Sequence, residues 1–217
     1  MQARLPSPRP VRIVLDGRYA RLEPLSAAHA ADLFESSAAP GAEQRFAYLF
    51  DMPPAALADM NAWIDKASRG EYPLFSTVVD KSSGRVAGRQ ALMRITPEHG
   101  VIEIGNILWG PAISRTRVST EALYLAARHV FEDLGYRRFE WKCNNLNEPS
   151  KAAARRFGFS YEGLFRQHMW TKDANRDTAW FAMLDSEWPA LRREYDRWLE
   201  PSNFDASGRQ RTKLQVL

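Results

Sequence analysis

The stretch at residues 114–123 reads SRTRVSTEAL and connects a predicted strand, Val101–Trp109, to a predicted helix. Apolar residues recur at helical spacing from Leu123 onward, until the pattern ends at Gly135. The N-terminus of a helix presents unpaired backbone N–H groups and the positive end of the helix dipole. Arg115 and Arg117 add two positive charges beside it. The stretch therefore predicts an anion-binding site, and the alternative is an ordinary strand-to-helix connection with solvated arginines.

Outward from this stretch, the spacing of apolar residues alternates between the period of a strand and that of a helix. The further predicted strands are residues 19–25, 74–79, 86–95, 138–143, 159–169 and 178–184, and the further predicted helices are residues 26–36, 57–67, 150–157 and 188–199. Residues 40–52 are predicted to be irregular. Three consecutive strands followed by a strand–helix–strand unit predict an α/β (α+β) sandwich.

Length and composition favour a single domain, because 217 residues with 45% hydrophobic content can bury a sizeable core. We expect that domain to span residues 18–199. Residues 1–17 are predicted to form a flexible N-terminal arm, since prolines interrupt them. Residues 200–217 are predicted to form a polar, disordered C-terminal tail.

Several function classes are disfavoured by the composition. No apolar run approaches the roughly 18 residues that a membrane span needs, and the N-terminus lacks the apolar region of a secretory signal. The single cysteine, Cys143, cannot form an internal disulfide, which favours a reducing, cytoplasmic setting. The net charge is +4, but the basic residues are scattered, which argues against direct nucleic-acid binding. No metal is expected, because no metal-ligand spacing links the four histidines, His29, His99, His129 and His168.

Three motifs downstream carry a resemblance to a known family. They are Asn147-x-x-Ser150, Gly158-Phe159-x-x-Glu162-Gly163 and Arg176-Asp177, and they follow Thr120-Glu121-Ala122 in order. Together they resemble the GNAT superfamily of N-acetyltransferases, and within it the branch that acetylates ribosomal-protein N-termini, over residues 18–199. The resemblance implies the GNAT fold, a central mixed, mostly antiparallel sheet flanked by helices. It also implies acetyl-CoA as cosubstrate, a primary amine as acceptor, no membrane partner and direct attack of the amine, and it leaves a homodimer open.

The resemblance assigns a set of residues to the binding of acetyl-CoA: Ile107, Leu108, Ser114, Arg115, Thr116, Arg117, Val118, Ser119, Thr120, Asn147 and Arg156. One position departs from the family pattern, because Arg117 stands where the loop usually has its central glycine. A positive φ there would cost on the order of 1 kcal/mol or more. We expect the loop to bend differently and the Arg117 side chain to join the phosphate contacts. The alternative is a reduced affinity for the cofactor.

Glu103 is the candidate general base. It alternates with Ile102 and Ile104 on a predicted strand, and it matches the position at which several GNAT members carry a base. It could remove the amine proton directly or through water. The alternative is a solvated carboxylate on a half-exposed strand. In the family a bulge on this strand frees a backbone N–H near Ile107 or Leu108 for the oxyanion, and Gly105 is compatible with such a bulge.

Ser150 is the candidate acid for the leaving thiolate. Ala154 occupies the position of the tyrosine that many GNAT enzymes use, so the tyrosine version is excluded. In the ribosomal-protein branch a serine on the first helical turn takes this role. The alternative is that Ser150 only satisfies the start of the helix, with Asn147 as N-cap.

The acceptor amine is the least defined part of this interpretation. A protein N-terminus and a small molecule both remain open, and the groove is expected from residues 45–52, 57–68 and 172–177. A GNAT-fold protein that binds acyl-CoA as a sensor or scaffold without turnover is the alternative function.

Overall fold

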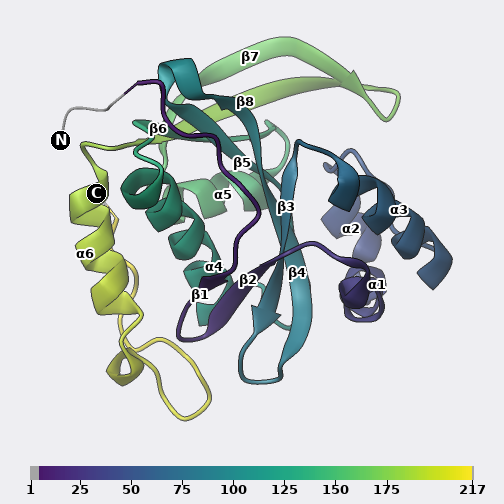
Figure 1. Cartoon of the computed structure of the whole chain (residues 1–217), viewed down its shortest axis with the longest axis horizontal. Helices are drawn as coiled ribbons and strands as arrows, with labels where there is room; N and C mark the ends of the chain where they lie inside the picture. Colours follow the sequence, from purple (N-terminus) through teal and green to yellow (C-terminus); the bar gives the residue numbers. More distant parts are fainter. Residues whose placement is uncertain (1–4, 217) are drawn as a thin grey trace. The chain divides into compact units, whose positions relative to one another are not determined.

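The computed structural model describes residues 5–216 of the chain, which divide into two compact units. The first unit holds residues 10–94 and 104–126, and the second holds the described residues up to 9, residues 95–103 and residues from 127 onward. Eight strands form one mixed sheet in the order β1-β2-β3-β4-β5-β6-β8-β7 (Figure 1), which confirms the predicted fold class.

Strands β2 to β4 pair antiparallel in the first unit, and a short strand β1 is added before them. The strands that lie wholly or mostly in this unit are β1 (Leu15–Asp16), β2 (Ala20–Pro24), β3 (Leu74–Asp80), β4 (Arg85–Thr96) and β5 (Val101–Trp109). Its helices are a 3-10 turn (Ala27–His29), α1 (Ala30–Ala38), α2 (Ala42–Phe46), α3 (Leu57–Arg69) and α4 (Arg117–Arg128). The predicted bounds of β5 are confirmed. Gly100 and Gly110 flank the strand directly on either side.

Helices α1 and α3 pack against β3 and β4 through an apolar core (Figure 1). Leu33 of α1 and Ile64 of α3 are fully buried there with Ala91 of β4. The ring of Trp63 meets Phe75 edge-on at 5.0 Å between centroids. Apolar positions at helical spacing therefore place the inner face of α3 where the sequence predicted it.

Helix α4 is fixed to the start of β2 by Glu121, which lies one turn into the helix and is buried. Its carboxylate accepts backbone N–H bonds from Arg18, Tyr19 and Ala20 at 2.9, 2.5 and 2.6 Å. A Cβ at Gly17 would lie 2.6 Å from this carboxylate, so the close approach requires glycine. The glutamate of the Thr120-Glu121-Ala122 motif thus positions the helix.

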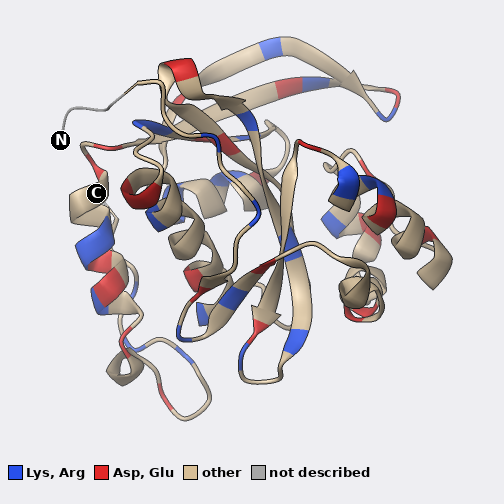
Figure 2. Ribbon diagram, in the orientation of Figure 1, with Lys and Arg blue, Asp and Glu red and all other residues tan. Residues whose placement is uncertain are grey.

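In the second unit, β6 and β7 both pair antiparallel with β8 (Figure 1). Its elements are a 3-10 turn (Pro97–His99), a π-helical turn (His129–Asp133), β6 (Arg138–Asn144), α5 (Glu148–Arg156), β7 (Ser160–Thr171), β8 (Ala174–Leu184), α6 (Trp188–Trp198) and a 3-10 turn (Pro201–Asn203). Lys172 and Asp173 join β7 to β8 as a tight turn in which both have positive φ. Residues 172–177, which the sequence analysis left between two predicted strands, are therefore a two-residue hairpin turn followed by the start of β8. Figure 2 shows charges of both signs along α6.

Three segments differ from their predicted structure. Residues 40–52 contain the short helix α2, and Leu15–Asp16 of the expected arm pairs with β2 as β1. The expected disordered tail folds back on α6. Asn203 donates to the Trp198 carbonyl and accepts from the Thr212 N–H, both at 2.9 Å. The buried side chain of Asn203 joins the end of α6 to residue 212 and so organises this segment, which average polarity does not reveal.

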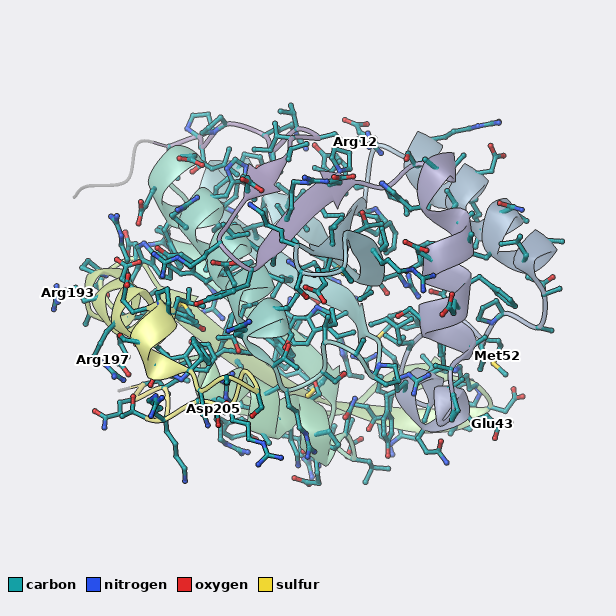
Figure 3. The ribbon with its side chains drawn as sticks, turned by 90° about the horizontal axis from the view of Figure 1, so that it is seen from below. Arg12, Glu43, Met52, Arg193, Arg197 and Asp205 are labelled. Carbon is teal, nitrogen blue, oxygen red and sulfur yellow. The ribbon has the colours of Figure 1, made fainter. Side chains whose placement is uncertain are left out.

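Replacing Glu121 with alanine should lower the free energy of unfolding by about 3 kcal/mol, because three backbone donors lose their acceptor. Denaturant unfolding measures this loss. The matched control is Glu43→Ala, since Glu43 also lies on a helix but is exposed (Figure 3) and should change stability by less than about 0.5 kcal/mol. Equal effects of the two substitutions would contradict the role given to Glu121.

Candidate active site

The loop between β5 and α4 is held by its own hydroxyl groups. Ser114 Oγ donates to the Trp109 carbonyl at 2.8 Å, and Thr116 Oγ1 donates to the Ile113 carbonyl at 2.7 Å. The Val118 N–H donates to Thr116 Oγ1 at 3.2 Å, so Thr116 caps the first turn of α4. The loop therefore has a defined shape without the family's glycine.

The left-handed residue of this loop is Arg115, with φ of 61°, and not Arg117. Arg117 is the first residue of α4, where no positive φ is needed. Its guanidinium carbon lies 4.4 Å from the centre of the Tyr19 ring. Arg117 therefore needs no positive φ, and its side chain stacks on an aromatic ring; whether it joins the phosphate contacts stays a prediction.

The donor set at the start of α4 fits an anionic group. Arg115 is exposed, and the first turn of the helix contains no acidic residue. Val118, Ser119 and Thr120 are buried, and both hydroxyls donate to the Thr116 carbonyl, at 3.1 and 3.0 Å. The Val118 N–H donates to Thr116 Oγ1 and the Thr120 N–H donates to the Thr116 carbonyl, so a phosphate at this turn would meet the positive end of the helix and the Ser119 N–H, and would have to compete for the other two.

Strand β5 carries the next predicted site residues. Its left-handed residue is Asn106, with φ of 50°, directly after Gly105, the residue that the sequence analysis found compatible with a bulge. Asparagine tolerates this conformation better than most residues, and extra residues in bulges adopt it. Ile107 directly after it is half-buried, and Leu108 is buried.

Glu103 is buried in an ion pair with Lys142 of β6. Lys142 Nζ lies 2.9 Å from Glu103 Oε2 and 2.6 Å from Glu140 Oε2. The side chains of Glu103, Lys142 and Glu140 are 3%, 6% and 9% exposed, respectively. The interpretation of Glu103 as a solvated surface carboxylate is therefore wrong.

The charges extend along β6 and onto its neighbours. Arg138 Nε lies 2.7 Å from Glu140 Oε1, and the Arg138 guanidinium also binds both carboxylate oxygens of Glu162. Lys142 Nζ stands 3.8 Å from the centre of the Trp180 ring. Such pairing and ring contact offset part of the desolvation cost of a buried cation.

Asn147 and Ser150 form the start of α5 as predicted. Asn147 is the N-cap, and its side-chain oxygen accepts the Ser150 N–H at 3.1 Å. Ser150 Oγ accepts a hydrogen bond from Trp141 Nε1 at 2.9 Å, which leaves its own hydrogen to donate. Burial raises the pKa of the Cys143 thiol, and a hydrogen bond with Ser150 opposes that rise. Ser150 therefore already contacts a sulfur atom.

The two candidate catalytic residues contact opposite faces of β6. Glu103 pairs with Lys142, whereas Ser150 bonds to Trp141, the preceding residue of the strand. Consecutive strand residues point to opposite faces. The structure therefore brings each of them to β6 without bringing them together.

Arg156 lies at the far end of α5. Its guanidinium carbon is 5.2 Å from the centre of the Phe157 ring and 5.3 Å from that of Trp198. Burial lowers the pKa of this guanidinium. The structure thus shows an aromatic environment for a side chain that was expected at the nucleotide end of the cofactor.

Sequence reasoning missed Lys142 and Glu140. A signal was present, because charged residues occupy every second position of β6, between Phe139, Trp141 and Cys143. A strand that alternates charged and aromatic residues indicates two different faces. The partner of Lys142 could not be found this way, because Glu103 lies on another strand.

The described residues offer neither a cluster of metal ligands nor a helix that could span a membrane. Across residues 5–216, no three His, Cys, Asp or Glu side chains come together as a metal ion would need. None of the helices formed by the described residues has the length and apolar character required to cross a membrane.

Comparison with known proteins identifies the family. The acetyltransferase (GNAT) domain matches residues 20–160. A GCN5-related N-acetyltransferase from Brucella melitensis is 57% identical, with a TM-score of 0.96 over 99% of this chain and 97% of that one. An acetyltransferase of the GNAT family from Chromobacterium violaceum is 35% identical, with a TM-score of 0.78 over 87% of this chain and 93% of that one. The chain therefore belongs to the GNAT acetyltransferase family, whose cosubstrate is acetyl-CoA.

More distant likenesses concern the fold alone. RimL, a ribosomal L7/L12 alpha-N-protein acetyltransferase, is 18% identical, with a TM-score of 0.68 over 82% of this chain and 98% of that one. No curated protein matches the sequence significantly.

Replacing Lys142 with methionine should lower the free energy of unfolding by about 3–5 kcal/mol, because two buried carboxylates lose their shared cation. Chemical denaturation measures the change. The control is Lys81→Met, which breaks a more exposed pair with Asp16 and should cost less than about 1 kcal/mol. A cost at Lys142 no larger than at Lys81 would show that the buried pairs contribute little.

Proposed function

We propose that this protein is an N-acetyltransferase that transfers the acetyl group of acetyl-CoA to a primary amine by direct attack. Family membership supports acetyl transfer in general. The observation that carries the finer proposal is the buried carboxylate of Glu103 on β5, held by Lys142 at 2.9 Å. A buried carboxylate with a fixed orientation is the kind of group that takes a proton from an attacking amine.

Acetyl-CoA supplies the activated acetyl group as a thioester. The start of α4 would hold its pyrophosphate through the positive end of the helix and the N–H groups of its first turn, of which those of Val118 and Thr120 would exchange their bonds to Thr116 for bonds to the phosphate, with Arg115 as the exposed cation. The backbone at Ile107 and Leu108, directly after the left-handed Asn106, would hold the pantetheine arm and offer an N–H to the oxyanion. Asn147 would contact the same arm from the start of α5.

Glu103 accepts the amine proton, directly or through water. Lys142 fixes one oxygen of the carboxylate, so the side chain cannot rotate away from the reacting amine. Lys142 is therefore a positioning residue in this mechanism.

Ser150 donates a proton to the leaving thiolate. Trp141 Nε1 donates to the serine oxygen at 2.9 Å, which orients the hydroxyl hydrogen away from the ring. The hydrogen bond by which Ser150 opposes the raised pKa of the Cys143 thiol supports this role, because its acceptor is also a sulfur atom.

The acceptor in this proposal is a protein N-terminus or a small-molecule amine, encountered in the cytoplasm. The motifs shared with the ribosomal-protein branch support the first. Arg176-Asp177 has a local explanation, because the Gln167 N–H donates to the Asp177 carboxylate at 2.7 Å. That bond, together with one from Asn175, lowers the pKa of Asp177 and stabilises the hairpin of β7 and β8.

Replacing Glu103 with glutamine should lower kcat/KM for acetyl transfer by about 100-fold or more, because the base is lost while the shape is kept. Amine-dependent release of the CoA thiol, measured over a panel of primary amines, gives the rate. Glu140→Gln is the matched control, because it removes the other carboxylate beside Lys142 and should retain activity within about threefold, since only the base contributes the large factor.

Full activity in Glu103→Gln would remove the base assignment, and equal losses in both variants would assign the effect to the ion pairs. Tight acetyl-CoA binding in calorimetry without thiol release for any amine would favour an acyl-CoA sensor. Absence of acetyl-CoA binding would contradict both functions.

A further inference from the structure

Arg89 is a buried arginine that the proposed mechanism does not use. It lies on β4, and its side chain is 3% exposed. Its guanidinium carbon lies 4.0 Å from the centre of the Trp63 ring on α3 and 5.5 Å from that of Phe75 on β3. Two aromatic rings therefore hold the planar guanidinium in a fixed orientation.

The charge of Arg89 is only half satisfied. Nη2 donates to Asp51 Oδ2 at 2.7 Å, whereas Nη1 is buried and has no hydrogen-bond partner among the residues that the structure describes. Burial lowers the pKa of this guanidinium, and the Asp51 carboxylate opposes that shift. A buried donor without an acceptor is costly, above all on a charged group, so it calls for an explanation such as a ligand that binds there.

The carboxylate that partners Arg89 comes from a surface loop. Asp51 follows α2, and its side chain is 32% exposed. Apolar side chains beside it on the same loop are exposed: Phe50 is 46% exposed, and Met52, labelled in Figure 3, is 70% exposed. A segment that exposes apolar groups can move at lower cost than a packed core element.

Two more buried polar atoms on this side of the sheet are without partners in the described part of the chain. They are Ser37 Oγ at the end of α1 and Arg45 Nε on α2. Arg45 also donates to the Ser37 carbonyl at 3.3 Å, and the neighbouring Ser36 hydroxyl donates to the Ala87 carbonyl of β4 at 2.8 Å. These links join α2 to α1 and α1 to β4, the strand that carries Arg89.

We propose that Arg89 is the carboxylate-recognition residue of the acceptor site, and that Asp51 occupies it in the absence of substrate. An acceptor carboxylate would displace Asp51 and bind both Nη1 and Nη2, as a planar guanidinium favours. The acceptor is then an amine that also carries a carboxylate, such as an amino acid. This inference rests on the proposed acetyl transfer only for its link to catalysis.

Equilibrium binding tests the subsite without requiring turnover. Calorimetry would compare each free amino acid of a standard panel with its amide, which has the same amine but no carboxylate. The wild-type protein should bind at least one acid about 100-fold more tightly than its amide, because a site built around a charged donor rejects the analogue that leaves it unpaired.

Variants assign the effect to the two residues. Asp51→Asn removes the competing carboxylate and should tighten binding of the acid, leaving the amide unchanged. Arg89→Met should abolish the difference between acid and amide. The control is Arg85→Met, an exposed arginine of the same strand paired with Asp32 and Glu35, which should change neither. If Arg89→Met does not fold, the wild type and Asp51→Asn decide the result.

Equal binding of acid and amide by the wild-type protein, or no binding of either, would overturn the subsite. The subsite would also be overturned if Asp51→Asn left the ratio of acid affinity to amide affinity unchanged. The ion pair of Arg89 and Asp51 would then have a structural role only. Failure of the proposed function looks different, because no amine of any kind would then release the CoA thiol even though the acids bind.

Discussion

Lys142 lies buried between the carboxylates of Glu103 and Glu140, and this arrangement constrains the second unit of the protein. Three largely desolvated charges are tolerable only if their geometry is kept, since removing one partner leaves the others unpaired. The register of β6 is fixed accordingly, because a shift by one residue would move every charged side chain to the aromatic face. The register of β6 and the position of the Glu103 side chain therefore depend on the same ion pairs of Lys142.

The opposite face of β6 follows from the same register. Trp141 points away from the charges and donates to Ser150, while Phe139 and Phe159 pack at 5.6 Å between ring centroids. Helix α5 is therefore attached to β6 through a hydrogen bond and aromatic contacts. A single strand supports both residues to which we assign proton transfers, one on each face.

Much of the fold could be predicted from the sequence, because the strands alternate and the helices have apolar stripes. The bounds of β5 are confirmed, and so is Asn147 as the N-cap of α5. Helix α2 was missed because five residues are too few for a helical period. The order of the C-terminal segment was missed because it depends on single side-chain hydrogen bonds of Asn203 to Trp198 and Thr212, which leave no periodic pattern in the sequence.

The site was predicted less well, for physical reasons. Glu103 was identified as a candidate, but its burial and its ion pair depend on β6, so they are non-local. Backbone irregularities lie one or two positions from where the family pattern suggested, at Arg115 and Asn106. Asparagine tolerates positive φ better than most residues, whereas arginine adopts it at a cost of about 1 kcal/mol, so the residue type alone did not locate the one at Arg115. Arg89 gave no signal in the sequence, since its significance lies in an unpartnered atom.

Hydrogen exchange measured with and without acetyl-CoA tests the central claim most directly, because it reports on the cofactor cradle residue by residue. Binding should slow exchange of the backbone amides at residues 107–108, 117–120 and 147–150, and leave the α1 and α3 helices largely unchanged. Protection confined to other segments, or no protection at saturating acetyl-CoA, would contradict the assignment of these residues to the acetyl-CoA site.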